Sequence, residues 1–327
     1  MKVLLKSAAA ALAVAVMLSP LSAAAQTVFK LGTTSPPANP EVVAAQKFAD
    51  LVKEKSGGKY RIDVLHSGQA GGEREIAEGL QLGTMHFAVL AGILQNFDPA
   101  LMIVEWDLLF KNNDHVRAAM NGEIGDKISE RLIEKVGARK LSTFMRTPRL
   151  LTTRQPVNSL ADLKGMKIRV PEMPARIAIW EALGARPTPM AFPEVVPALQ
   201  LGTIDGQENP IGMITSAKIH EAVKYLADTR HLYGFMLLLA AEPVWEKLPD
   251  ADKKMMSEAA AEAAVFNDQL VTESEETMMK EAGAKMQITK PDLEPWRAAA
   301  ADIYRKYADV EGFSELYEAI VKLGEKY

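Results

Sequence analysis

The hydrophobic positions in the first third of the chain follow two periodicities in turn, which predicts strands alternating with helices. An apolar run over residues 28–34 ends at a Ser-Pro-Pro loop, as a short strand would. Asn39-Pro40-Glu41 then supplies the cap, the proline and the acidic residue that are typical of a helix start, and apolar residues recur with a 3.6-residue period as far as Gly57-Gly58. Residues 60–64 alternate between apolar and charged, which predicts a half-buried strand.

The same alternation of elements continues to residue 90. A glycine-rich loop over 68–72 precedes a second predicted helix over 73–82 and a third predicted strand over 87–90. This order predicts βαβ units built around a sheet with parallel strand pairs.

Strands and helices also alternate in the second half of the chain. We expect strands over 140–145, 166–170 and 232–241, the last of them buried on both faces because it is almost wholly apolar. Helices are predicted over 174–183 and 193–201, and a glycine follows each of them as a stop signal.

Residues 250–281 have the pattern of one long helix. At 1.5 Å per residue this helix would be ~48 Å long, more than the width of one small domain, so we expect it to bridge two domains. No tandem repeat and no proline- or glycine-rich linker marks a clean boundary. We therefore predict an α/β fold of two discontinuous lobes, residues 27–146 with 235–272 and residues 147–234 with 273–327.

Residues 1–25 have the features of a secretory signal peptide. Lys2 and Lys6 precede an uninterrupted apolar run over 8–18, and Ala23-Ala24-Ala25 matches an A-x-A cleavage pattern. The apolar run is too short to span a bilayer as a helix. We predict cleavage near Ala25, before Gln26, and export of the mature chain; an uncleaved anchor is the alternative.

Composition excludes several classes of protein. The chain has 327 residues, 48% hydrophobic and 24% charged, which is ordinary for a globular protein and long enough for two domains. The absence of Cys excludes disulfides, thiolate nucleophiles and cysteine-ligated metals. A pI of about 5.9 and a net charge of −4 argue against a nucleic-acid partner.

No catalytic or metal-binding motif is recognisable. The five histidines are scattered, and His220-Glu221 does not continue as a zinc-protease motif because Lys224 occupies the position of the second histidine. The sequence contains no glycine loop for phosphate and no G-x-S-x-G turn. We expect no enzymatic activity, no cofactor and no metal.

Polar residues near strand ends are the best candidates for a binding site. Arg169 lies in a predicted strand that Pro171 ends, and ligands of open α/β sheets collect at the carboxyl ends of strands, where a guanidinium can bind a carboxylate with two hydrogen bonds. Arg149 follows another predicted strand, beside Arg146. For both arginines, the alternatives are a structural salt bridge or a solvated surface position.

Asn209 precedes Pro210 and repeats the Asn-Pro pattern of the first helix. We expect it to cap a helix that starts there. A helix N-terminus also favours anions, so the same residue is a candidate for ligand binding.

Four consecutive motifs then resemble a known family. They are LKGMKIRVPE over 163–172, PTPMAF over 187–192, ALQLG over 198–202 and DGQENP over 205–210. Together they are similar to the extracytoplasmic solute-binding proteins of tripartite ATP-independent periplasmic (TRAP) transporters, in the dicarboxylate-binding branch. The resemblance extends over almost the whole mature chain. It implies two α/β lobes that close on an organic anion, with a long helix spanning both, and a monomer that delivers its solute to TRAP membrane subunits from the periplasm.

The resemblance also implies roles for individual residues. Arg169 would make the principal two-pronged contact with the solute carboxylate, and Arg149 would be the second arginine of the site. Asn209 would be a polar contact, Phe192 would pack on the solute, and Glu73 would accept a solute hydroxyl.

The identity of the solute depends on Glu172 in this comparison. Glu172 stands where sialic-acid binders have Asn, which argues against sialic acid. Two acceptors, Glu73 and Glu172, suit a polyhydroxylated acid such as a hexuronate or an aldonate. Another carboxylate, such as a four-carbon dicarboxylate or other hydroxy acid, and a ligand-sensing role beside a membrane receptor are the alternatives.

Overall fold

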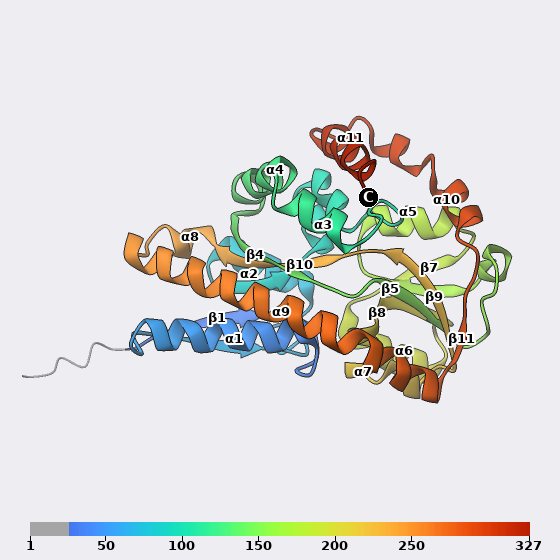
Figure 1. Ribbon diagram of the computed structural model, residues 1–327, viewed down its shortest axis with the longest axis horizontal. Helices are drawn as coiled ribbons and strands as arrows, with labels where there is room; N and C mark the ends of the chain where they lie inside the picture. The colour runs from blue at the N-terminus through green and yellow to red at the C-terminus, as the bar shows by residue number, and fades with distance from the viewer. Residues whose placement is uncertain (1–25) are drawn as a thin grey trace, which may run out of the picture.

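Two β-sheets form the framework of the molecule, one in each of two lobes (Figure 1). The computed structural model describes residues 26–327, so the predicted signal peptide over 1–25 lies outside the described residues. The first sheet has the order β2-β1-β3-β10-β4 and the second has the order β11-β9-β5-β8-β6-β7. The strands are β1 Thr27–Gly32, β2 Tyr60–Leu65, β3 Phe87–Leu90, β4 Ala138–Met145, β5 Arg149–Thr153, β6 Lys167–Val170, β7 Arg186–Pro189, β8 Gly206–Pro210, β9 Tyr225–Leu232, β10 Phe235–Ala241 and β11 Gln287–Thr289.

Helices surround both sheets. They are α1 Pro40–Lys55, α2 Glu73–Leu82, α3 Asn113–Met120, α4 Glu123–Arg131, α5 Pro174–Ala182, α6 Val195–Leu201, α7 Ile211–Ser216, α8 Glu242–Trp245, α9 Asp250–Lys285, α10 Glu294–Ala300 and α11 Phe313–Gly324. The first lobe also holds the short 3-10 helices η1 (Gly92–Asn96) and η2 (Pro99–Glu105), and η5 (Phe192–Glu194) precedes α6.

The two lobes contain the same βαβαβ unit. In the first lobe β1 pairs in parallel with β2 and β3, and in the second lobe β6 pairs in parallel with β7 and β8. Both units end their second helix with the sequence Leu-Gln-Leu-Gly-Thr, over 80–84 and 199–203. The glycine has a left-handed backbone in each case, with φ of 69° at Gly83 and 74° at Gly202, so it stops the helix at the same point. The carboxyl ends of both parallel units border the same space between the lobes, since Ala91 after β3 and Asn209 at the end of β8 line one cavity.

The chain passes between the two sheets three times. It does so from β4 to β5, from β9 to β10, and from β10 to β11 through α9. Helix α9 packs against α1 and β4 of the first lobe and against α7 of the second, and it runs along the length of the molecule (Figure 1). The expected long helix that spans both lobes is confirmed, and it is four residues longer than predicted at its C-terminal end.

The apolar periodicity accounts for the core of the first lobe. Ile76, Ala77 and Leu80 are the buried residues of α2, and all seven residues of β10 are buried between β3 and β4. Continuous apolar character is what a central strand covered on both faces requires.

Three sequence predictions for residues 193–241 differ from the structure. Asn209 and Pro210 end β8, and α7 begins at Ile211, because a residue before proline favours the extended conformation. The apolar run over 232–241 is divided between two strands in different sheets, with Tyr233 and Gly234 between them. The predicted helix over 193–201 begins as η5 and becomes α-helical at Val195.

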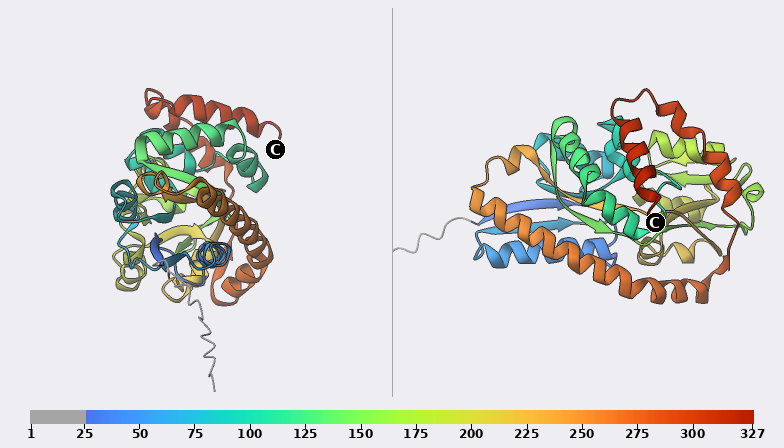
Figure 2. Two further views of the ribbon diagram at one scale, coloured as in Figure 1. Left: turned by 90° about the vertical axis from the view of Figure 1, so that its left-hand side faces the viewer. Right: turned by 45° about the horizontal axis from the view of Figure 1, so that its top comes forward.

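The C-terminal segment returns to the first lobe. Helix α11 packs against η2, α3 and α4, on the side of the molecule away from α1 (Figures 1 and 2). Helix α11 thus contacts elements of the lobe to which the prediction did not assign it. The boundaries 27–146 with 235–272 and 147–234 with 273–327 remain a proposal.

Candidate functional site

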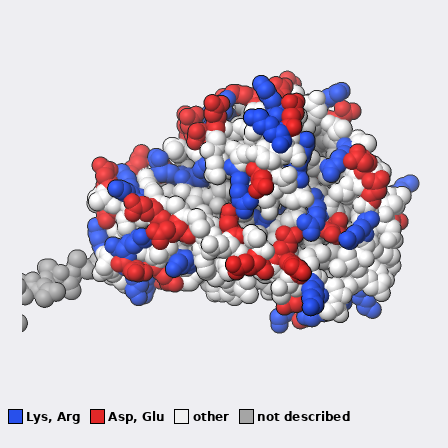
Figure 3. Space-filling model, viewed as in Figure 1, with Lys and Arg blue, Asp and Glu red and all other residues white. Residues whose placement is uncertain are grey.

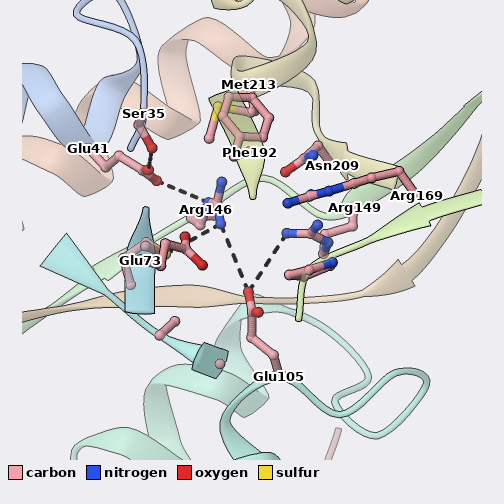
Figure 4. Close-up of a pocket in the computed structure, with 14 residues that line it drawn as sticks. Ser35, Glu41, Glu73, Glu105, Arg146, Arg149, Arg169, Phe192, Asn209 and Met213 are labelled. Carbon is pink, nitrogen blue, oxygen red and sulfur yellow. Dashed lines mark hydrogen bonds and ion pairs between the residues drawn. The ribbon is translucent and has the colours of Figure 1, made fainter. Parts of the chain in front are cut away.

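A cavity of about 400 Å³ lies between the lobes, at the carboxyl ends of the two parallel units. This is the position at which open α/β sheets bind ligands. Charged and polar side chains from both lobes point into it (Figure 4). The lining residues are Ser35, Glu41, Glu73, Ala91, Gly92, Glu105, Arg146, Arg149, Arg169, Pro171, Phe192, Asn209, Met213 and Met236.

Arg169 is the cation of this cavity with no carboxylate partner among the described residues. Its Nε and Nη2 both donate to the backbone carbonyl of Met190, at 3.0 and 2.7 Å, which fixes the plane of the guanidinium. Burial lowers the pKa of Arg169 to about 10, so the group stays charged at neutral pH. A buried guanidinium bound only to a neutral carbonyl is suited to receive an anion.

Arg149 is held in a different way. Its Nε donates to Oε2 of Glu208, and its Nη2 donates to the backbone carbonyl and to Oε1 of the same residue, at 2.7 and 3.0 Å. Its Nη1 lies 3.7 Å from Oε1 of Glu105. Arg149 begins strand β5, which the sequence analysis did not predict, and its charge is balanced within the protein. The arginine therefore lines the cavity and also belongs to a buried ionic network.

The network continues beneath the cavity through Arg176, on α5. Its Nη1 donates to Oε1 of Glu208 at 2.9 Å, and its Nε lies 3.3 Å from Asp107. His231, on β9, lies 3.2 Å from Glu208 through Nε2. Burial alone would raise the pKa of Glu208, but Arg149 and Arg176 hold it well below its usual range, so Glu208 is ionised at neutral pH.

Glu73 begins helix α2 and lies on the first-lobe side of the cavity (Figure 4). Burial raises the pKa of Glu73, and Glu105 raises it further, while Arg169 and the other two arginines of the cavity oppose the shift. Its Oε1 accepts a long hydrogen bond from Oγ1 of Thr34, at 3.4 Å. The carboxylate thus has acceptor capacity to spare for a ligand hydroxyl.

Asn209 and Phe192 complete the second-lobe wall. The side chain of Asn209 donates to Oε1 of Gln207 at 2.5 Å, so it is oriented by its own strand and does not cap a helix. The ring of Phe192 lies 5.8 Å from the guanidinium carbon of Arg169, within the range of a cation–π contact. Five of the six predicted site residues are thereby brought together around one cavity.

Glu172 is the exception. It is exposed and lines an adjoining hollow of about 630 Å³ that shares Glu73, Arg169 and Phe192 with the main cavity. Its backbone carbonyl accepts a hydrogen bond from Nδ2 of Asn96, across the lobes, at 2.9 Å. The sequence places Glu172 directly after the strand of Arg169, but Pro171 ends that strand and turns the chain outward.

Several residues of the cavity were missed by sequence reasoning. The sequence marks Glu41 only as an acid in the first turn of a helix, and Arg146 only as a neighbour of Arg149. Ser35 and Glu105 carried no signal, because a serine before two prolines and a glutamate in an apolar segment are both common. Their role depends on contacts between segments of the first lobe that are far apart in the sequence, which one-dimensional spacing does not show.

Comparison with known proteins now identifies the family. Residues 31–310 match the model of the bacterial extracellular solute-binding protein family 7, known as DctP. The chain belongs to this family. The predicted resemblance to TRAP solute-binding proteins is therefore confirmed, and family 7 proteins are solute-binding components of transport rather than enzymes.

Three relatives illustrate the similarity. A solute-binding protein of Roseobacter denitrificans is 37% identical over 270 residues, covering 83% of both chains; its crystal structure with bound L-galactonate superposes with a TM-score of 0.86 over 90% of this chain and 98% of that one. A TRAP solute-binding protein from Polaromonas, bound to D-erythronate, is 35% identical with a TM-score of 0.86, over 90% and 98% of the two chains. The sialic acid-binding protein SiaP of Vibrio cholerae is 32% identical over 293 residues, 88% of this chain and 91% of its own.

Other features of this solute-binding protein agree with a small-molecule site. Acidic and basic side chains are interspersed over the described part of the face in Figure 3, without a broad region of one sign that would attract a polyanion. Over residues 26–327, no group of three or more His, Asp or Glu side chains is arranged so that it could hold a metal ion, and no helix is long and apolar enough to cross a membrane.

Proposed function

We propose that this solute-binding protein captures a sugar acid, such as an aldonate or a hexuronate, in the periplasm and delivers it to the membrane subunits of a TRAP transporter. It would act as a monomer, without catalysis and without a cofactor. The observation that carries the proposal is Arg169, a buried guanidinium whose hydrogen bonds, within residues 26–327, go only to a backbone carbonyl. A solute carboxylate would supply the missing counter-charge.

The other walls of the cavity suit a solute with several hydroxyls. Glu73 and Asn209 offer an acceptor and an amide beside Arg169, and Phe192 offers an apolar face for the carbon chain. The bound ligands of the Roseobacter and Polaromonas proteins, L-galactonate and D-erythronate, combine one carboxylate with a hydroxylated chain. These ligands support a sugar acid as the class of solute, and the screen below would identify which sugar acid binds.

A thermal-shift screen of the mature protein tests the proposal. The panel would contain aldonates, hexuronates, sialic acid, four-carbon dicarboxylates and neutral sugars. A ligand at 100 times its dissociation constant adds ~2.7 kcal/mol of stability, which a melting curve resolves easily. We expect stabilisation by at least one aldonate or hexuronate and none by neutral sugars. Stabilisation by dicarboxylates alone would refute the sugar-acid assignment and support the alternative solute class.

A further inference from the structure

A second ion pair stands at the end of the cavity opposite Arg169, and no role has been assigned to it so far. Arg146 follows β4, and Glu41 lies in the first turn of α1, both in the first lobe. Nε of Arg146 lies 3.0 Å from Oε2 of Glu41. Figure 4 shows this pair on one side of the cavity, with Arg169 and Asn209 on the other.

The pair is fixed from behind. Oγ of Ser35 donates to Oε1 of Glu41, while Oε2 of Glu41 faces Nε of Arg146 and has no hydrogen-bond partner among the described residues. Beyond the pair lies a smaller cavity of about 270 Å³ that shares Glu41, Arg146 and Met213 with the main one. Glu41 and Arg146 thus form the wall that limits how far a solute bound at Arg169 can extend.

One donor of this wall has no partner. Nη2 of Arg146 is buried and makes no hydrogen bond with any residue of the described chain, where Nη1 meets only the sulfur of Met236 at 3.4 Å and Glu105 at 3.9 Å. Arg146 as a whole is 6% exposed. Leaving a buried donor unpaired is unfavourable, so the free protein is arranged to receive an oxygen atom there.

The charges around Nη2 of Arg146 favour a hydroxyl oxygen of the solute over a carboxylate oxygen. Arg146 is already balanced by Glu41 and lies near Glu105, whereas Arg169 has no carboxylate partner among the described residues. A carboxylate brought to this end would face the charge of Glu41, and like charges brought together inside an interface are strongly unfavourable. A neutral hydroxyl would accept from Nη2 without that penalty.

We propose that Arg146, whose positive charge is balanced by Glu41, binds a hydroxyl at the far end of the solute and makes the site selective for sugar acids with one carboxylate over those with a carboxylate at each end. This inference rests on the proposed function and narrows it to aldonates and similar monocarboxylates. Arg169 recognises the charged end and the Glu41–Arg146 pair recognises the uncharged end.

Matched pairs of ligands test the inference by titration calorimetry at neutral pH. The pairs are galactonate with galactarate, gluconate with glucarate, and erythronate with meso-tartrate, and the members of each pair differ in whether the last carbon is a hydroxymethyl or a carboxylate. For every pair in which binding is measured, we expect the monocarboxylate to bind at least about tenfold more tightly. Equal or tighter binding of a dicarboxylate would overturn the inference and leave the sugar-acid function standing. Failure of every monocarboxylate and hexuronate to bind would overturn the proposed function itself.

Two variants test whether the preference for monocarboxylates depends on Glu41. Glu41→Gln removes the charge behind Arg146, so it should weaken the monocarboxylate and narrow the ratio within a pair to less than about threefold. Glu54→Gln, on the exposed far end of the same helix, should leave both affinities unchanged. An unchanged ratio in folded Glu41→Gln would contradict the role of Glu41. The wild-type comparison needs no variant, so it decides the inference even if Glu41→Gln does not fold.

Discussion

Arg149 and Glu208 are joined by hydrogen bonds from Nε and Nη2 of the arginine to both carboxylate oxygens and the backbone carbonyl of the glutamate. Among the described residues, the guanidinium of Arg169 in the same cavity donates hydrogen bonds only to the backbone carbonyl of Met190. Two arginines that look alike in the sequence therefore differ in what they can do. The charge of Arg149 is balanced inside the protein, whereas the charge of Arg169 is available to a ligand.

Replacing Glu208 should destabilise the free protein severely. Glu208→Gln keeps the shape of the side chain but leaves Arg149 and Arg176 without their shared counter-charge. Removing one partner of a buried ion pair costs ~3–5 kcal/mol. Urea unfolding at neutral pH measures the loss, and a loss below about 1 kcal/mol would mean that the network does not stabilise the fold.

The same residue gives the network an acid sensitivity. The pKa of Glu208 is held well below its usual range in the folded protein, so its contribution to stability is present above the ordinary carboxyl pKa and is lost as the pH falls through the lowered value. We expect the difference in unfolding free energy between wild type and Glu208→Gln to shrink as the pH falls below ~4. A difference that stays constant down to pH 3 would contradict this assignment.

Substitution of Arg149 should lower the stability of the ligand-free protein more than substitution of Arg169 does. Arg149→Lys keeps the charge but cannot reproduce the hydrogen bonds to Glu208, so we expect a loss of ~1–3 kcal/mol in the unfolding free energy without ligand. Arg169→Lys should lose ~1 kcal/mol or less, because it breaks only bonds to one neutral carbonyl. Melting curves of the two ligand-free variants make the comparison, and the opposite order would refute it.

Glu73 should lower the free energy of unfolding of the ligand-free protein at neutral pH and contribute to solute binding. Its pKa is raised in the fold, so folding favours its protonated form, and this contribution is lost as the pH rises through the raised value. Glu73→Gln should therefore make the free protein more stable at neutral pH and no more stable at pH 4. It should also weaken a bound sugar acid about ten- to a hundredfold, the effect of losing a hydrogen bond to a charged acceptor. Urea unfolding at pH 4 and pH 7 tests the effect on stability, and calorimetric titration with the sugar acid tests the effect on affinity. A variant less stable than the wild type at neutral pH would contradict the effect on stability.

Periodicity and turn residues predicted the βαβ units and the long helix, since those elements are long and strongly patterned. Asn209 shows where such reasoning fails, because the Asn-Pro pair caps α1 but ends strand β8, and only pairing with β5 distinguishes the two cases. Arg169 was found because a strand and a proline mark its position. Arg146, Glu41 and Glu208 were not, since they gain their roles only when segments distant in the sequence meet in the folded lobes.

Solute should draw the lobes together about the segments that connect them. The cavity is lined from both lobes, so a ligand bridging Arg169 and the first-lobe residues favours the closed form. Small-angle scattering of the ligand-free and saturated protein should show a smaller radius of gyration with solute and the mass of a monomer in both. An increase in mass on saturation would contradict the proposed monomer.

Titration calorimetry of Arg169→Lys, with whichever sugar acid stabilises the wild type most, tests the central claim most directly. An ammonium cannot reproduce the planar fork of a guanidinium on a carboxylate, so we expect a loss of ~2–5 kcal/mol, or about thirtyfold to several thousandfold in affinity. Arg186→Lys, at an exposed position on the edge strand β7 of the same lobe, should bind as the wild type does. If Arg169→Lys binds the acid as tightly as the wild type, the carboxylate does not lie on Arg169 and the account of the site is wrong.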